Sequence, residues 1–224
     1  MRAVLVISPH ADDAVLSTGQ FMAGRPDVVC VTVFAGTPKA ASVLTKYDAL
    51  SGFKNAREAI EARRAKDREA MALLGAKPVH LSFVDQQYGQ PTNRKVLAEE
   101  LKRQITLTEP ELVIGPVGIG HPDHVLVREA LLDAALDDDT PLWLYEDVPA
   151  RVREPELVPE ALEAVRSRQS EVTLGFCGDG PLADKMAALW AYRSQLPLFP
   201  NRHELLVAER FWRASKAVTP EEPA

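Results

Sequence analysis

Residues 2–13, RAVLVISPHADD, indicate both the fold and the place where a functional site should lie. Residues 2–8 form a largely apolar run of strand length, bounded by polar residues, which predicts a buried β-strand. Three ionisable side chains, His10, Asp12 and Asp13, follow this strand directly. Ligands of parallel sheets bind beyond the carboxyl ends of the strands, so these side chains predict a site at that end of the sheet.

Strand-like and helix-like segments alternate as far as residue 146. Residues 28–34, VVCVTVF, predict a second buried strand. Residues 54–74 are rich in helix formers and are followed by Gly75, which we expect to cap the helix. The other expected segments are a loop at 35–53, helices at 13–24, 93–107 and 123–136, and strands at 79–83, 112–115 and 142–146. This alternation predicts an α/β fold, a Rossmann-like parallel (or mostly parallel) sheet with helices on both faces.

The alternation is less regular beyond residue 150. We expect a helix at 159–168, a strand at 171–177 and helices at 181–195 and 201–216. The sequence contains no internal repeat, linker-like stretch or low-complexity segment. We therefore expect a single domain over residues 1–218, followed by a frayed tail at 219–224.

The composition bounds the class of protein. Hydrophobic residues make up 46% of the 224 residues and charged residues 26%, as is typical of soluble globular proteins. The first apolar run is too short for a signal peptide and meets Asp12 and Asp13 directly, so we expect a cytoplasmic protein. Cys30 and Cys177 are interpreted as reduced core thiols. The formal net charge of −6 disfavours nucleic acid and membranes as partners and favours a small molecule.

A second cluster, His121-Pro122-Asp123-His124, lies just beyond the expected strand LVIGPV. If this fourth strand lies beside the first, as in common doubly wound sheets, both clusters reach the crevice where the strand order reverses. Two segments that are far apart in the chain would then form one site.

The residue types in the two clusters fit a catalytic metal site. Catalytic zinc takes three protein ligands, often imidazole nitrogens and carboxylate oxygens, and keeps one position for water. His10 and Asp13, three residues apart across a turn, and His124 from the next helix supply such a set. Asp12 is then left beside the metal, where it can accept a proton from the bound water.

Each residue also has an ordinary structural interpretation. Asp12 or Asp13 alone is a common helix N-cap, and His124 alone is a common surface residue of a helix. Asp123 suits the start of a helix through the helix dipole, whatever it binds. Capping does not explain three histidines and three aspartates at two strand ends, so we favour the metal site.

The motifs PHADD and HPDH resemble those of the LmbE/PIG-L family of zinc-dependent N-acetylglucosaminyl deacetylases. The family carries a His-x-Asp-Asp motif after the first strand and a His-Pro-Asp-His-like motif further on. RRAKDREAMALLGA, YEDVP and AYRSQ are also similar to the family, so the resemblance covers most of the chain. The resemblance implies that His10, Asp13 and His124 are the zinc ligands and that Asp12 is the general base. It also implies that His121 stabilises the oxyanion or protonates the leaving nitrogen, and that Asp123 orients a histidine.

The resemblance also implies the reaction and its ligands. One Zn2+ per chain would support removal of the acetyl group from an N-acetylglucosamine-type amino sugar or glycoconjugate, and other divalent metals accept the same donors. The candidate substrate-binding residues are Arg63, Arg64, Asp85, Tyr88, Arg193 and Gln195. Arginine stems that merely cover apolar surface, and an ordinary turn at 85–88, are the alternatives. His80 and His203 are interpreted as structural, and a homo-oligomer is compatible with the sequence.

Two other functions compete with this interpretation. Clusters of aspartate and histidine on parallel sheets also serve metal-dependent phosphoesterases and nucleotidases, although that chemistry commonly uses two metals and more carboxylates. A non-catalytic sugar-binding domain of the same fold is the alternative from a different class. A binding module has no need of Asp12 beside a complete ligand set, which disfavours it.

Overall fold

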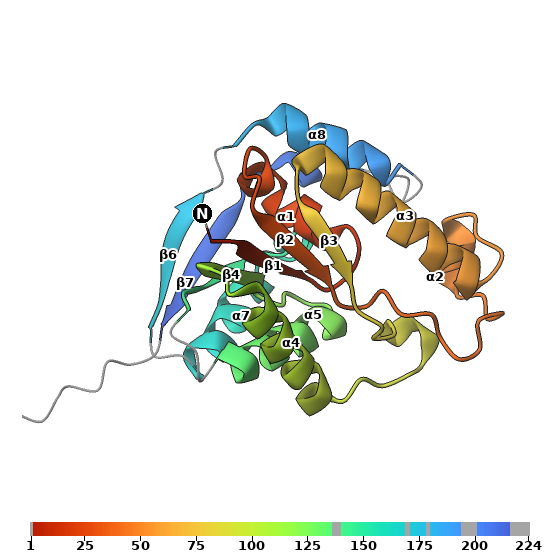
Figure 1. Ribbon diagram of the computed structural model, residues 1–224, viewed down its shortest axis with the longest axis horizontal. Coiled ribbons are helices and arrows are strands. Elements are labelled where there is room, and N and C mark those ends of the chain that lie inside the picture. The colour runs from red at the N-terminus through yellow and green to blue at the C-terminus, as the bar shows by residue number, and fades with distance from the viewer. Residues whose placement is uncertain (1, 136–139, 169–170, 178–179, 194–200, 216–224) are drawn as a thin grey trace, which may run out of the picture.

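One sheet of seven strands organises the described part of the chain, which comprises residues 2–135, 140–168, 171–177, 180–193 and 201–215 of a computed structural model (Figure 1). The strand order is β3-β2-β1-β4-β5-β7-β6. Neighbouring strands among the first five are parallel to one another, whereas β7 is antiparallel to both of its neighbours, β5 and β6. The strands are β1 (Val4–Ser8), β2 (Val28–Thr32), β3 (Lys77–His80), β4 (Leu112–Pro116), β5 (Leu142–Tyr145), β6 (Glu171–Cys177) and β7 (Arg210–Ser215). The prediction of a mostly parallel α/β sheet is confirmed.

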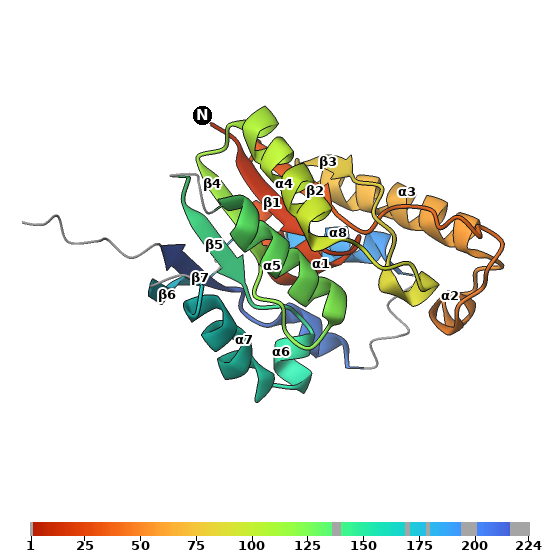
Figure 2. The ribbon, with the colours of Figure 1, turned by 90° about the horizontal axis from the view of Figure 1, so that it is seen from below.

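Helices cover both faces of the sheet (Figures 1 and 2). One apolar cluster packs α1, α3 and α8 against the sheet, and a second packs α4, α5 and α7 against the opposite face. Two short helices, α2 and α6, lie in the connections that follow β2 and β5. The helices are α1 (Asp13–Met22), α2 (Lys46–Leu50), α3 (Ala56–Leu74), α4 (Arg94–Thr108), α5 (Pro122–Ala135), α6 (Ala150–Arg153), α7 (Leu157–Arg166) and α8 (Leu182–Ala191), with short 3-10 helices η1 (Gln86–Tyr88) and η3 (Arg202–Leu206).

The topology brings the two histidine–aspartate clusters together. The chain runs from β1 outward through β2 to β3, then returns to place β4 on the other side of β1. The strand order therefore reverses between β1 and β4, and the connections that leave these two strands diverge there. All five residues of β1 are buried, as expected of a central parallel strand covered on both faces. The expectation that the fourth strand lies beside the first is confirmed.

Local sequence signals define α3, the longest helix. Asn55 caps its N-terminus by accepting a hydrogen bond from the backbone N–H of Glu58. Gly75 ends it with a φ of 72°, a left-handed conformation that glycine adopts without a steric cost. The expectation that Gly75 caps this helix is confirmed. Within the described residues, no helix is both long enough and apolar enough to span a membrane.

The last expected helix, at residues 201–216, is wrong. Only η3 is helical there, and the chain then forms β7, which pairs with β5 and β6. Phe211 and Ala214 are buried in the two apolar clusters on opposite faces of the sheet, as the side chains of a strand covered on both faces are. The segment at 35–53 is not entirely a loop, because it contains α2. Residues 216–224, which include the expected tail, lie outside the described residues.

A buried ion pair fastens α1, α8 and the approach to β7 to one another. Lys185 donates to Glu209 over 3.0 Å, and both side chains have 0% exposure. The Glu209 carboxylate also accepts from the backbone N–H groups of Gln20 and Phe21, at 2.7 and 2.9 Å. Burial raises the pKa of Glu209 and lowers that of Lys185, although the attraction between the two charges opposes both shifts.

Replacing Glu209 by glutamine is expected to lower the free energy of unfolding by about 3–5 kcal/mol, because Lys185 would stay buried without a counter-charge. Denaturant unfolding followed by circular dichroism measures this loss. Glu100→Gln is the matched control, since Glu100 pairs with a largely exposed Arg103 and should matter far less. Equal losses in the two variants would contradict the account of the buried pair.

Candidate metal centre and active-site pocket

A tight turn after β1 holds the first cluster. Ser8 donates a hydrogen bond to the carbonyl of His10 over 2.5 Å and accepts one from the backbone N–H of Ala14 over 3.0 Å. The backbone N–H of His10 donates to Asp13 Oδ2 over 2.7 Å. These bonds fold the chain back so that the side chains of His10 and Asp13 face one point.

Three donor atoms converge at this point. His10 Nδ1 and His124 Nε2 each lie 3.1 Å from Asp13 Oδ2, and the two nitrogens are 3.3 Å apart. Metal bonds of about 2.0–2.1 Å in a tetrahedral arrangement place two donors about 3.3 Å apart. The three atoms thus have the separations that one tetrahedral cation requires, and they form one of two candidate metal-ion groups in the described chain.

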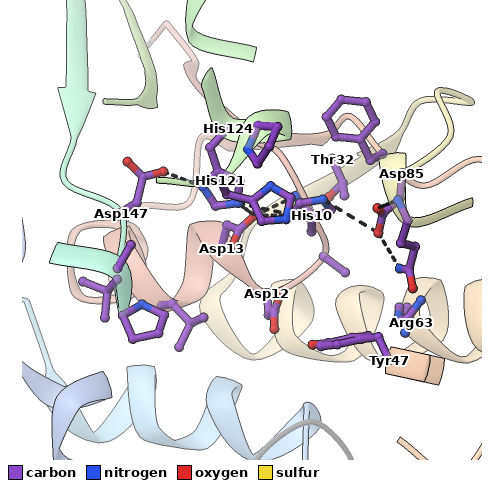
Figure 3. A pocket seen from close by; sticks show the side chains of 18 of the residues that line it. His10, Asp12, Asp13, Thr32, Tyr47, Arg63, Asp85, His121, His124 and Asp147 are labelled. Atoms are coloured by element: carbon purple, nitrogen blue, oxygen red, sulfur yellow. Dashed lines mark hydrogen bonds and ion pairs between the residues drawn. The ribbon is translucent and has the colours of Figure 1, made fainter. Parts of the chain in front are cut away.

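Carboxylates behind the two histidines orient their rings, and Figure 3 shows that of Asp147 beside His124. His124 Nδ1 lies 2.6 Å from Asp147 Oδ1, and His10 Nε2 lies 3.0 Å from Asp123 Oδ2. A ring nitrogen that donates to a carboxylate leaves the other nitrogen with its lone pair free for a metal, as is usual for metal-binding histidines. The backbone N–H groups of Gly118 and Ile119 fix Asp147 in turn, at 2.8 and 3.1 Å from Oδ2.

The second candidate group consists of His10, His121 and Asp123. It would use His10 Nε2, which already faces Asp123, and Asp123 Oδ2 also accepts from the backbone N–H of Gln86 over 3.2 Å. His121 is exposed, and its Nδ1 accepts from the backbone N–H of Asp123 over 3.1 Å. His124 is buried whereas His121 is exposed, and each histidine of the first group has a carboxylate behind it, so the group of His10, Asp13 and His124 is the better metal site.

The electrostatics of that group are those of a cation site. Burial disfavours a charged His124, but Asp13 and Asp147 outweigh it and raise the pKa of His124 to about 10. Burial would likewise raise the pKa of Asp13, but His124 and His10 hold it well below the usual range. In the protein without metal, the carboxylates therefore stabilise positive charge on the imidazoles. A bound metal ion would bring positive charge to the same place.

Asp12 lies outside this group, on the side of Tyr47 and Arg63 (Figure 3). It occupies the N-cap position of α1 without making a side-chain cap hydrogen bond, so the helix-cap interpretation does not account for it. Burial and the neighbouring charge of Asp13 raise the pKa of Asp12 to about 6. The carboxylate of Asp12, which makes no capping bond, is therefore available to accept a proton beside the metal site.

A pocket of about 490 Å³ opens over the site. Asp12, Asp13, His10, His121 and His124 line its floor, whereas Asp123 is buried behind His10. A volume of this size suits a small-molecule ligand. The remaining lining comes from α1, α3, the ends of β2 and β3 and the connections that follow β2, β3, β4 and β5. Its polar members include Tyr47, Arg63, Arg64, His80, Asp85, Gln87, Arg153 and Glu154.

Some of the expected substrate-binding residues line the pocket, and others do not. Arg63, Arg64 and Asp85 line the pocket. Arg63 donates to Asp48 over 2.5 Å and to the Tyr88 hydroxyl over 3.3 Å, and Tyr88 is not among the lining residues of this pocket. Arg193, another expected substrate-binding residue, is exposed and does not line the pocket. Gln195 lies outside the described residues.

Sequence reasoning missed several residues around the site. Asp147 lies two residues beyond the end of β5, so its position near a strand end was the available signal. Tyr47 reaches the pocket from α2, in a segment that lacks a clear helical period. His80, interpreted as structural, lines the pocket while its Nε2 lies 2.7 Å from the buried Asp67.

The fold and this donor set define a class, α/β proteins with a metal centre of two histidines and one carboxylate at the carboxyl end of the sheet. A family model described as GlcNAc-PI de-N-acetylase (PIG-L) matches residues 5–135, more than half of the chain. The chain belongs to this family, whose members cleave carbon–nitrogen amide bonds of sugars. No protein in a curated set of sequences matches the chain significantly.

Similar solved structures include deacetylases and one enzyme with another reaction. The A40926 pseudoaglycone deacetylase is 28% identical, with a TM-score of 0.72 over 95% of this chain and 96% of that one. The teicoplanin deacetylase in its zinc-inhibited form is 24% identical, with a TM-score of 0.77 over 97% and 99%. A 4-carboxy-2-hydroxymuconate hydratase from Pseudomonas putida is 16% identical, with a TM-score of 0.59 over both whole chains. The fold alone therefore does not specify the reaction.

Proposed function

We propose that the protein is a zinc-dependent hydrolase that removes the acetyl group from an N-acetylglucosamine-type amino sugar or glycoconjugate. The observation that carries the proposal is the convergence of three donor atoms beside Asp12, whose side chain makes no capping hydrogen bond. Membership of a de-N-acetylase family supports the reaction. The donor separations support a tetrahedral cation such as zinc.

His10, Asp13 and His124 would hold the metal, and Asp147 and Asp123 would orient the two imidazoles. When bound, the metal supplies an electrophile that polarises the acetamide carbonyl and acidifies a water molecule. The protein supplies the remaining chemistry, which is positioning, proton transfer and stabilisation of the developing negative charge.

Asp12 is the proton carrier in this mechanism. It accepts a proton from the attacking water as the new carbon–oxygen bond forms, and it returns that proton to the amine as the carbon–nitrogen bond breaks. Acetate and a free amino sugar are the products. Asp12 suits this part because it faces the pocket beside the metal ligands without being one of them.

His121 is the donor to the oxyanion. Its Nδ1 accepts a hydrogen bond from the backbone, so in the neutral ring the proton resides on Nε2. In the protein without metal, partial desolvation of its ring against the pocket and the positive charges of His10 and His124 lower the pKa of His121, which favours this neutral form. A neutral imidazole that lines the pocket donates a hydrogen bond well and releases a proton poorly. His121 therefore stabilises negative charge, while Asp12 protonates the amine.

The outer pocket recognises the sugar. Asp85 lines the pocket beside His10 and is the acceptor for sugar hydroxyls. Arg64 donates to the carbonyl of Ala35 through Nε, and its remaining donors can reach the substrate. Arg63 forms part of the pocket wall, and Asp48 and Tyr88 hold it there from outside the lining.

A panel of N-acetylated amino sugars tests the proposal. We expect acetate and free amine to appear in equal amounts from N-acetylglucosaminides, measured by enzymatic acetate assay and amine derivatisation. Phosphate release from a generic phosphomonoester, without acetate release, would instead identify a metal-dependent phosphoesterase. Sugar binding without either product would identify a non-catalytic domain.

A further inference from the structure

A buried network connects the C-terminal end of α8 to the turn that carries Asp12. Tyr192, which follows α8, is 1% exposed, and its hydroxyl donates to the carbonyl oxygen of Ala11 over 2.6 Å. The same hydroxyl lies 2.8 Å from Asp67 Oδ1 on α3. Asp67 Oδ2 lies 2.7 Å from His80 Nε2 and 3.2 Å from Thr32 Oγ1. Segments that are far apart in the sequence thus meet beneath the pocket floor.

A count of hydrogens shows which hydrogen of this network is shared. It contains four contacts, namely Tyr192 to Ala11, Tyr192 to Asp67, His80 to Asp67 and Thr32 to Asp67. Each contact needs one hydrogen, and Tyr192, Thr32 and His80 Nε2 can supply one each. The single hydrogen of the Tyr192 hydroxyl therefore faces two acceptors, the Ala11 carbonyl oxygen at 2.6 Å and Asp67 Oδ1 at 2.8 Å.

The Ala11 carbonyl belongs to the peptide unit that joins Ala11 to Asp12. Because a peptide unit is planar, fixing this oxygen fixes the plane from which Asp12 projects. Asp12 has no side-chain cap bond to hold its carboxylate in place. The direction of that carboxylate therefore depends on the backbone, and the Tyr192 hydroxyl holds the Ala11 carbonyl oxygen of that backbone.

We propose that Tyr192 is a positioning residue, which holds the Ala11–Asp12 peptide so that the Asp12 carboxylate points at the attacking water. The inference rests on the proposed function, because it needs Asp12 to act as the proton carrier. Tyr192 belongs to the AYRSQ segment, in which sequence reasoning selected Arg193 and Gln195 instead. Tyr192 itself does not line the pocket.

Tyr192→Phe is expected to lower kcat at least tenfold, with KM within twofold and one metal bound per chain as in the unmodified protein. Tyr145→Phe is the matched control, because the Tyr145 hydroxyl is also fully buried and donates to a backbone carbonyl, that of Ile7 within the sheet, over 3.2 Å. We expect kcat of Tyr145→Phe to stay within twofold. Acetate release from an N-acetylglucosaminide and metal analysis measure these quantities.

Asp67→Asn provides a second, independent variant. An amide can donate to Tyr192 and accept from His80 and Thr32, so all four contacts survive, and we expect at least a third of kcat to remain. Unchanged kcat in Tyr192→Phe, equal losses in Tyr192→Phe and Tyr145→Phe, or a tenfold loss in Asp67→Asn would each overturn the inference. Failure of the unmodified protein to release acetate would instead overturn the proposed function.

Discussion

Asp12→Asn is expected to lower kcat by about 10²–10⁴-fold while the metal content stays at one ion per chain. Asparagine has nearly the shape of aspartate, but it cannot accept the proton of the attacking water or return it to the amine. Since Asp12 is not one of the three converging donors, the metal site should survive the change. Steady-state kinetics of acetate release and metal analysis of the same preparation measure both effects.

Asp133→Asn is the matched control for this substitution. Asp133 pairs with Arg94 and Arg168 away from the pocket, so the same chemical change there should leave kcat within twofold. An Asp12→Asn protein that keeps a tenth or more of the original kcat would show that another group carries the proton. A parallel loss of metal would show that Asp12 helps to bind it.

His124→Ala is expected to abolish stable metal binding, leaving less than about one tenth of an ion per chain after gel filtration. The substitution removes one of three protein ligands and leaves Asp13 and His10 as a weak pair. Loss of acetate release should follow the loss of metal. Metal analysis and isothermal titration with Zn2+ give the result without reference to activity.

Two further variants are expected to show a partial loss of metal binding and no loss, for comparison with His124→Ala. Asp147→Asn should weaken metal binding about 10–100-fold, because Asp147 orients His124 without reaching the metal. His203→Ala should bind metal normally, since His203 is exposed and does not line the pocket. Normal metal content in His124→Ala would remove His124 from the ligand set.

Sequence reasoning succeeded where local patterns govern the structure. An apolar run of strand length ends at Ser8, and the ionisable residues follow it directly, so their place at the carboxyl edge of the sheet could be predicted. The same signal placed the second cluster after β4. The strand order then brings His10 and His124 within 3.3 Å of one another, as the doubly wound topology led us to expect.

Sequence reasoning failed where contacts between distant segments decide the structure. Residues 210–215 form a strand because β5 and β6 flank them, although the sequence reads equally well as a helix. Tyr192 acquires a role only through Asp67 and the Ala11 carbonyl, which lie more than a hundred residues away in the chain. The sequence could place Arg63 near the pocket, but it could not predict that Arg63 donates a hydrogen bond to Asp48 of α2.

Acetate release by protein stripped of metal and then reloaded tests the central claim most directly. A chelator should abolish acetate release from an N-acetylglucosaminide, and one equivalent of Zn2+ per chain should restore it together with an equal amount of free amine. Undiminished acetate release from protein proven free of metal would contradict the account.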